Sequence, residues 1–188
     1  SAPSAPSAPD LSSSDDTGSS NSDNITSDVR PQFSGTAEAN STVEIFLDGS
    51  SIGTTSTNGS GNWSFGANSD LSDGTYSITA KATDAAGNVS TVSSSDGMAI
   101  DHTAPLGGAV LDGGDVDLDF TPSSSTIDAS WSGFSDELSG LAYYHIAVGT
   151  EAGESDVHDW EPVGLEQSHV SQNLSLENGE NYFVSVVA

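Results

Sequence analysis

Apolar and polar residues alternate in short runs along the chain from Pro31 onward. Alternation is the pattern of a β-strand with one buried face, and none of the runs repeats with the period of a helix. Turn signals such as "DGSS", "NGSG" and "SDG" separate the runs. The runs that predict strands lie at residues 32–37, 42–49, 51–58, 62–68, 74–83 and 89–100. Strands at roughly ten-residue spacing without intervening helices predict an antiparallel Greek-key β-sandwich.

A second set of strands is predicted after Pro105. Proline has no backbone donor and favours an extended conformation in the residue before it, so "IDHTAP" closes the first unit. The further runs lie at residues 115–122, 126–134, 141–150, 159–164, 169–176 and 181–188. The predicted fold class is therefore all-β, with two tandem antiparallel Greek-key β-sandwiches at residues 10–103 and 104–188.

The second sandwich is predicted to lack its last strand. Residues 71–82, "LSDGTYSITAKA", align with residues 176–188, "LENGENYFVSVVA", with one residue inserted in the second. In the first unit the matching strand leads through a turn at Asp84 to a final strand, whereas the second run has no such continuation in this sequence. Two explanations stay open: the visible chain stops before that strand, or a donor strand from another chain completes the sheet.

Two polar segments are interpreted separately from the strands. The triplet repeat "SAPSAPSAP" at residues 1–9 cannot form a core, and it predicts an extended, semi-rigid linker. In the run at residues 115–120, alternation places Asp115, Asp117 and Asp119 on one face of a strand. We interpret this as a charged outer face that discourages edge pairing.

The predicted cores consist of the inward-facing apolar residues of the strands. In the first unit they are Phe33, Val43, Ile45, Leu47, Ile52, Trp63, Phe65, Leu71, Tyr76, Ile78, Ala80, Val89 and Ile100. In the second they are Trp131, Tyr144, Ile146, Val148, Leu174, Leu176, Tyr182, Val184 and Val186. Trp160, between Asp159 and Glu161, is the tryptophan expected to be most exposed.

The charge of the chain narrows the possible functions. It has 28 acidic residues against two basic ones, a formal net charge of -26, which excludes binding to nucleic acid or to an anionic membrane surface. Such a charge destabilises a compact fold unless cations screen it or bind to it, which points to an extracellular setting. There is no cysteine, and no apolar run approaches the ~18 residues of a membrane span, so membrane contact is expected only through regions outside this sequence.

Several motifs of the first unit resemble a known family. "DDTGSSNSDNIT", "GTAEANSTVEIFLDGSSIGTT", "GNWSF", "LSDGTYSITAKATDAAGNVS" and "IDHTAP" recur in the same order in the bacterial immunoglobulin-like repeats of giant adhesins exported by type I secretion. "ASWSGFSDELSGLAYYHIAVGTEAG", "DVHDWEPVG" and "LENGENYFVSVVA" look like a bacterial fibronectin type III-like module. The resemblance implies extracellular, non-catalytic β-sandwiches that contact neighbouring modules of the same chain and bind calcium at loops and domain junctions.

Clustered acidic residues give two candidate calcium sites, because calcium takes about six to eight oxygen ligands. The first cluster is Asp15, Asp16, Asp23 and Asn24, with a disordered polar loop as the alternative. The second is a shared junction site, with the alternative that Asp84 and Asn88 only make a tight turn and that Asp101 is solvated. Its predicted ligands are Asp84, Asn88 and Asp101 from the first unit and Asp136 or Glu137 from the second.

The sequence does not favour an enzyme. "GSSIG" at residues 49–53 matches the serine-hydrolase pattern, but it lies in a predicted hairpin rather than between a strand and a helix. The histidines lack the spacing of a zinc protease. We expect a spacer module of a surface or secreted adhesin whose adhesive target the sequence does not identify. The alternatives are an accessory module of a secreted polysaccharide-degrading enzyme and a subunit of an extracellular filament.

Overall fold

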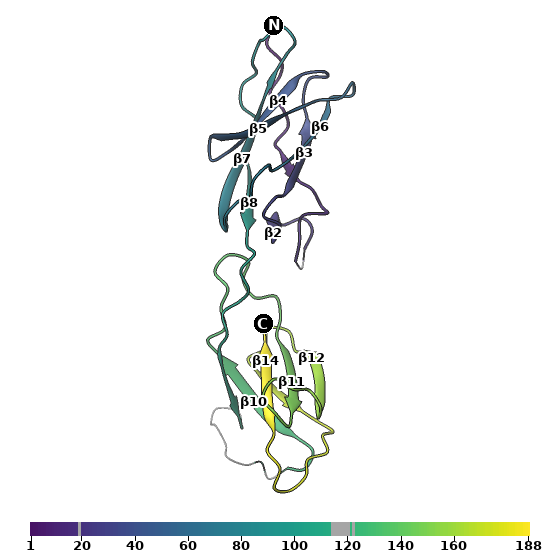
Figure 1. Cartoon of the computed structure of the whole chain (residues 1–188), viewed down its shortest axis with the longest axis vertical. Coiled ribbons are helices and arrows are strands. Elements are labelled where there is room, and N and C mark those ends of the chain that lie inside the picture. Colours follow the sequence, from purple (N-terminus) through teal and green to yellow (C-terminus); the bar gives the residue numbers. More distant parts are fainter. Residues whose placement is uncertain (19, 114–120, 122) are drawn as a thin grey trace. The chain divides into compact units, whose positions relative to one another are not determined.

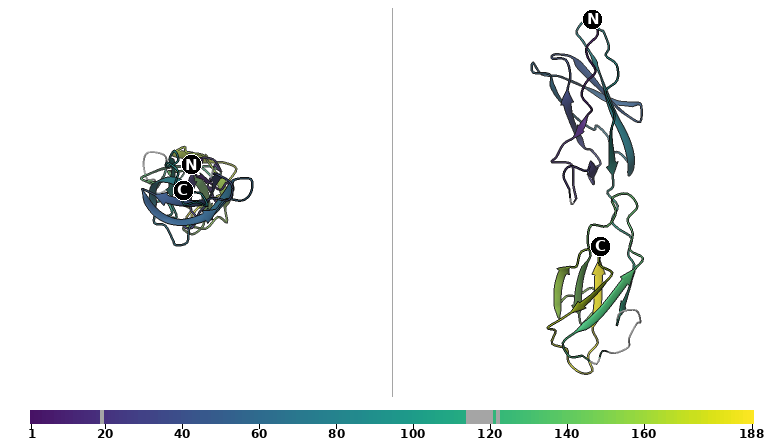
Figure 2. Two further views of the ribbon diagram at one scale, coloured as in Figure 1. Left: turned by 90° about the horizontal axis from the view of Figure 1, so that it is seen from above. Right: turned by 180° about the vertical axis from the view of Figure 1, so that it is seen from behind.

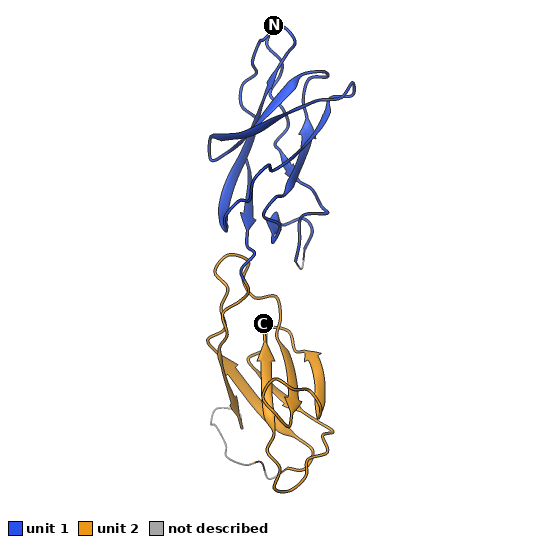
Figure 3. Ribbon diagram, viewed as in Figure 1, with its two compact units in different colours: residues 1–103 blue, residues 104–188 orange. Residues whose placement is uncertain are grey.

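The computed structural model describes residues 1–18, 20–113, 121 and 123–188, and the described part of the chain contains only strands, turns and loops. It forms two compact units, Ser1–Thr103 and Ala104–Ala188, shown in separate colours in Figure 3. Each unit contains two sheets, so the predicted all-β fold with tandem sandwiches is confirmed. Among the residues that the structure describes, no helix is long and apolar enough to cross a membrane.

Unit 1 is a sandwich of a three-stranded and a five-stranded sheet (Figure 1). Its strands are β1 (Asp10–Leu11), β2 (Ile25–Thr26), β3 (Gln32–Thr36), β4 (Thr42–Leu47), β5 (Ser50–Ser56), β6 (Asn62–Gly66), β7 (Gly74–Thr83) and β8 (Asp96–Ile100). The sheet orders are β1-β3-β6 and β2-β8-β7-β4-β5. All pairs are antiparallel except β2 with β8, which run parallel.

The core of unit 1 lies between these two sheets. Alternate residues of β4 and β7 are fully or almost fully buried, as Val43, Ile45 and Ile78 show, and Phe33 and Trp63 meet them from the opposite sheet. Burial of such side chains is the main favourable term in folding, at about 1.5–3 kcal/mol for each large apolar residue. The sequence pattern did not single out the buried residues Leu11, Ala82, Met98 and Ala99.

The strand predicted at residues 89–100 is shorter than expected, because β8 begins only at Asp96. Val89 is 53% exposed and makes only an isolated bridge, so its assignment to the core was wrong. The buried hydroxyls of Ser90 and Ser93 accept hydrogen bonds from the backbone N–H groups of Ala82 and Ala80. The backbone N–H groups of the same serines donate to the carbonyl oxygens of Ala82 and Ala80, so each serine is bonded to β7 through one backbone and one side-chain group. A buried polar residue thus stands where alternation predicts an apolar one.

The triplet repeat at residues 1–9 does not behave as a free linker. Pro3, Pro6 and Pro9 are all buried against unit 1. Chains rich in proline favour a helix with three residues per turn, so prolines three residues apart share one face. The repeat that suggested a spacer therefore also creates an apolar face, and that face packs on the sandwich.

Unit 2 contains two three-stranded sheets, seen from behind in the right-hand view of Figure 2. Its strands are β9 (Ala109–Asp112), β10 (Ile127–Ser132), β11 (His145–Gly149), β12 (His158–Pro162), β13 (Ser168–Ser171) and β14 (Phe183–Val187). The orders are β13-β10-β9 and β12-β11-β14, with antiparallel pairing throughout. The predicted acidic face at Asp115, Asp117 and Asp119 lies outside the described residues.

The core of unit 2 is centred on Trp131, Tyr144, Ile146 and Val148, all of which are buried. Val184 and Val186 on β14 are only partly buried, although they lie opposite Val148 and Ile146 on β11. Within the described part of the chain β14 pairs with β11 alone. Its other edge therefore has no strand partner there.

Candidate functional site

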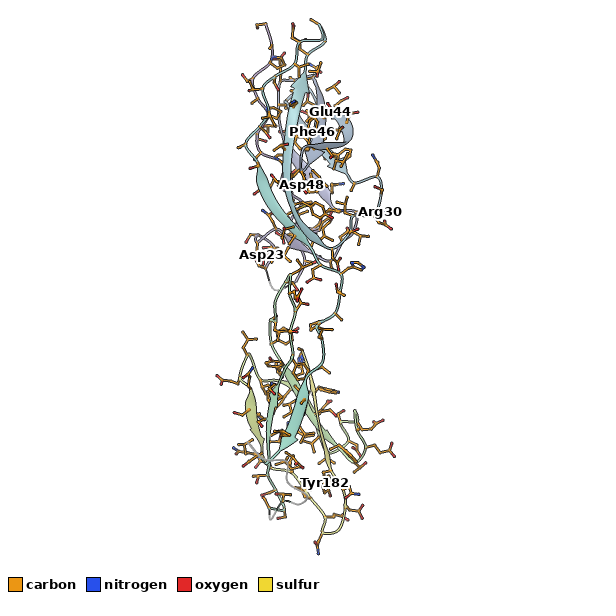
Figure 4. The ribbon with its side chains drawn as sticks, turned by 90° about the vertical axis from the view of Figure 1, so that its left-hand side faces the viewer. Asp23, Arg30, Glu44, Phe46, Asp48 and Tyr182 are labelled. Carbon is orange, nitrogen blue, oxygen red and sulfur yellow. The ribbon has the colours of Figure 1, made fainter. Side chains whose placement is uncertain are left out.

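The first predicted calcium cluster lies in the loop that connects β1 to β2, at the end of unit 1 remote from the N-terminus (Figure 1). Asp23 lies at this same end (Figure 4). β2 follows the loop and pairs with β8, with Ile25 opposite Ala99. Both ends of the loop are thus held by strands of the sandwich.

Asp15 holds this loop to β3. Its Oδ2 atom accepts a hydrogen bond from the backbone N–H of Gln32 at 2.7 Å, and its Oδ1 atom accepts one from the Ser14 hydroxyl at 2.9 Å. The buried Thr26 hydroxyl donates to the Asp15 carbonyl oxygen. The Asp15 carboxylate therefore serves the local fold.

Asp16 is buried, with only 6% of its surface exposed. Its Oδ2 atom accepts a hydrogen bond from the backbone N–H of Asn24 at 3.2 Å, whereas its Oδ1 atom is buried without any hydrogen-bond partner. Burial raises the pKa of the Asp16 carboxyl, and the nearby Asp23 charge raises it further. A buried carboxylate oxygen without a partner is costly, and a bound cation removes that cost.

Asp23 and Asn24 lie beside Asp16. The Asp23 Oδ1 atom accepts from the backbone N–H of Ile25 at 3.2 Å. Asn24 has a left-handed backbone with φ of 60°, which asparagine tolerates better than most residues. Its side-chain amide donates to Oδ2 of Asp96 at 3.3 Å, so β8 also supports the loop. Sequence reasoning missed Asp96, because no local pattern links residues 72 positions apart.

This donor set fits calcium. The carboxylates of Asp16 and Asp23 are hard oxygen ligands, and backbone carbonyls, the Asn24 amide oxygen and water are the remaining donors that calcium accepts. No group of three or more His, Asp and Glu side chains among the described residues is arranged to hold a metal ion. A calcium ion at Asp16 would therefore take most of its ligands from amides, carbonyls and water.

Asp84 and Asn88 form a closed turn after β7. The Asp84 carboxylate accepts hydrogen bonds from the backbone N–H groups of Ala86 and Asn88 at 2.9 and 2.8 Å and from the Asn88 side chain at 2.8 Å. The Asn88 bonds, the side-chain bond most strongly, hold the pKa of Asp84 below its usual range. This carboxylate already has donors in the turn itself.

Asp101 follows β8 and is buried. Its backbone N–H donates to the Thr26 carbonyl at 2.8 Å, and its Oδ1 atom accepts from the Thr103 N–H at 3.2 Å. Close by, the Asp73 carboxylate accepts from the Thr103 hydroxyl and contacts the His102 ring, and the Thr103 bond is the main cause of its lowered pKa. Asp73, which sequence reasoning missed, fixes the end of unit 1.

Asp136 and Glu137 belong to unit 2 and lie in the segment after β10. The Asp136 Oδ1 atom accepts from the backbone N–H groups of Ser139 and Gly140 at 3.0 and 3.2 Å, so it caps a turn. Glu137 is exposed. The shared junction site combines residues of both units and stays a prediction.

The serine-hydrolase pattern lies in a hairpin. Asp48 and Gly49 have positive φ angles of 47° and 79°, and they join β4 to β5. Leu47 lies opposite Ser50 across this turn. The pattern therefore lacks the strand-to-helix turn that exposes a nucleophilic serine.

Of three comparisons with known proteins, one identifies the family of the chain. Among solved structures, the "Central Fibronectin-III array of RIM-binding protein" is similar at 14% sequence identity and a TM-score of 0.33, covering 100% of this chain and 63% of that one. The comparison with curated proteins gave no match. The family model of the bacterial Ig-like domain matches residues 2–102, more than half of the sequence, and the chain thus belongs to the bacterial Ig-like domain family.

Proposed function

We propose that this chain is a non-catalytic spacer of a large bacterial adhesin, secreted or held at the cell surface, and that calcium binds its β1–β2 loop. Bacterial Ig-like domains are typically non-catalytic and typical of surface or secreted proteins. The adhesin role extends this family assignment through the resemblance of the first unit to adhesin repeats. Calcium would neutralise part of the negative charge of the chain at the buried Asp16 carboxylate.

The observation that carries the calcium proposal is the buried Oδ1 atom of Asp16, which has no hydrogen-bond partner. The ionised Asp16 is opposed both by burial and by the charge of Asp23. Asp84 and Asp136, in contrast, have their carboxylates bonded to N–H groups of their own turns. Of the predicted calcium ligands, Asp16 is thus the one whose surroundings favour a cation most.

The binding need not be tight to matter. Free calcium at ten times the dissociation constant stabilises the folded site by about 1.4 kcal/mol, and a hundredfold excess by about 2.7 kcal/mol. Extracellular modules often bind calcium with dissociation constants of about 0.1–1 mM. We therefore propose that calcium holds the β1–β2 loop on the sandwich and stiffens the module.

Titration calorimetry with three chains tests the calcium site. Calcium is added to the unaltered chain, to Asp16→Asn and to Asp10→Asn. Asp10 is an exposed acidic residue on the neighbouring β1, so its replacement removes one charge away from the site. We expect saturable heat for the unaltered chain and Asp10→Asn, and at least a tenfold weaker response for Asp16→Asn. Equal responses from all three chains would mean that calcium only screens the negative charge of the chain and does not occupy a site at Asp16.

A second candidate function is an accessory module of a polysaccharide-degrading enzyme. It is favoured by Trp160 on β12, which is 37% exposed and can offer a ring face to a sugar. Pull-down on chitin, cellulose and alginate distinguishes the two functions. A spacer stays in the supernatant, whereas a carbohydrate-binding module is retained and loses retention in Trp160→Ala.

A further inference from the structure

The N-terminal triplet repeat lies in a groove of unit 1 beside β3. Three prolines, Pro3, Pro6 and Pro9, are buried there, while Ser4 and Ala5 between them are exposed. Proline fixes its own φ, and the polyproline II helix has three residues per turn, so this spacing presents one continuous apolar face. The burial pattern follows that period.

Ser7 fixes the register of the segment on β3. Its backbone N–H donates to the Thr36 carbonyl at 2.9 Å, and its hydroxyl accepts from the Thr36 N–H at 2.9 Å. The segment then continues into β1, where Asp10 lies opposite Ser34. Residues 7–11 thus cover the edge of β3, and Pro9 within that stretch has no backbone donor for a further strand.

Gly35 of β3 lies close to both the Ser7 hydroxyl and the Trp63 ring. A Cβ atom at position 35 would lie 2.6 Å from Cζ2 of Trp63 and 2.8 Å from the Ser7 hydroxyl oxygen, so only glycine allows this approach. The Trp63 Nε1 atom is buried without a hydrogen-bond partner. Proline-rich segments elsewhere dock on aromatic side chains, and the close approach at Gly35 brings the Ser7 segment near the Trp63 ring.

From these contacts we infer that unit 1 has a binding groove for a Pro-x-x-Pro chain in polyproline II form, and that residues 1–9 are its resident ligand. The groove selects proline at the three buried positions. It tolerates other residues at Ser4 and Ala5, which line a cleft of about 350 Å³ together with Ser7, Thr36, Ala37 and Glu38. This inference does not depend on calcium.

Amide hydrogen exchange on the intact chain tests whether the groove is occupied. The Ser7 amide is bonded to Thr36, so we expect it to exchange at least about 100-fold more slowly than in the free peptide SAPSAPSAP. The exposed Ser4 serves as the internal comparison and is expected to exchange faster than Ser7. Exchange of Ser7 at the free-peptide rate would overturn the inference.

Peptide binding tests whether the groove recognises the sequence. A chain that lacks residues 1–8 is mixed with SAPSAPSAP or with SAASAASAA, and amide shifts of Thr36 and Trp63 are followed. We expect saturable shifts with the first peptide and at least tenfold weaker binding of the second. Equal binding of both peptides contradicts recognition of proline. So does the absence of any peptide binding to a truncated chain that is folded. If the truncated chain does not fold, the exchange measurement on the intact chain decides.

Discussion

The backbone N–H of Asn24 donates to Oδ2 of Asp16 at 3.2 Å, while Oδ1 of the same carboxylate is buried without a partner. One oxygen of the carboxylate therefore shapes the β1–β2 loop, and the other has no hydrogen-bond partner. The bonded turn carboxylates of Asp84 and Asp136 differ in this respect. The proposed cation site rests on that difference.

Without calcium, Asp16→Asn is expected to stabilise unit 1 at pH 7. The pKa of Asp16 is raised by burial and by Asp23, so its ionised form is less favourable in the folded state than in the unfolded state. Its contribution to stability is present below the unfolded pKa and is lost as pH rises through the folded one. Thermal melts in chelator should show a midpoint a few degrees higher for Asp16→Asn than for Asp10→Asn. A lower midpoint for Asp16→Asn than for Asp10→Asn would show that the ionised Asp16 carboxylate has a stabilising partner in the folded protein.

Asp84→Asn is expected to reduce the acid sensitivity of unit 1. The pKa of Asp84 is lowered by its bonds from Asn88, so this group stabilises the fold above its unfolded pKa of about 3.9. That stability is lost as pH falls through the lower folded pKa. Chemical denaturation at pH 7 and pH 2.5 measures it. The variant should be less stable at pH 7, with a smaller loss on acidification; an unchanged loss would contradict this role.

Gly35→Ala should destabilise unit 1 by about 1–3 kcal/mol, the usual cost of overpacking. The added methyl group would meet the Trp63 ring at 2.6 Å, and both strands of that contact are held in register. Gly66→Ala is the matched control, because a Cβ atom there meets nothing within 4 Å. Urea denaturation of both variants is the measurement. Equal stability of the two would mean that the Trp63 side chain moves aside freely.

Trp131→Ala should destabilise unit 2 by about 3–5 kcal/mol, as expected for the loss of a buried large aromatic residue. Trp131 packs edge to face on Tyr144 with ring centroids 5.6 Å apart and is 3% exposed. The control Trp160→Ala removes a tryptophan that is 37% exposed. We expect the control to cost less than about 1 kcal/mol in the denaturation transition of unit 2. A similar cost for both variants would contradict the core assigned to this unit.

Period-two alternation made most strands predictable, because inward positions such as Val43, Ile45 and Leu47 recur at every second residue. The pattern failed where buried hydroxyls of Ser90 and Ser93 accept hydrogen bonds from the backbone of β7. It could not reveal that the triplet repeat packs on unit 1, since composition alone describes a spacer equally well.

The candidate site was only partly predictable. Acidic composition identified Asp15 and Asp16 together, but the structure gives them different partners, because one carboxylate bonds to the Gln32 backbone and the other is left half unpaired. Asp96 reaches Asn24 from a strand far along the chain. Such contacts depend on the sandwich topology, which no local motif encodes.

Amide chemical shifts recorded by NMR during a calcium titration test the central claim most directly. The account predicts saturable shifts at residues 15–25 and at Asp96, with smaller and unsaturated shifts in the turn of Asp84 and Asn88. The same spectra with Asp16→Asn should lose the saturable shifts. Uniform, unsaturated changes over all acidic loops, or saturable shifts that persist in Asp16→Asn, would contradict a calcium site at Asp16.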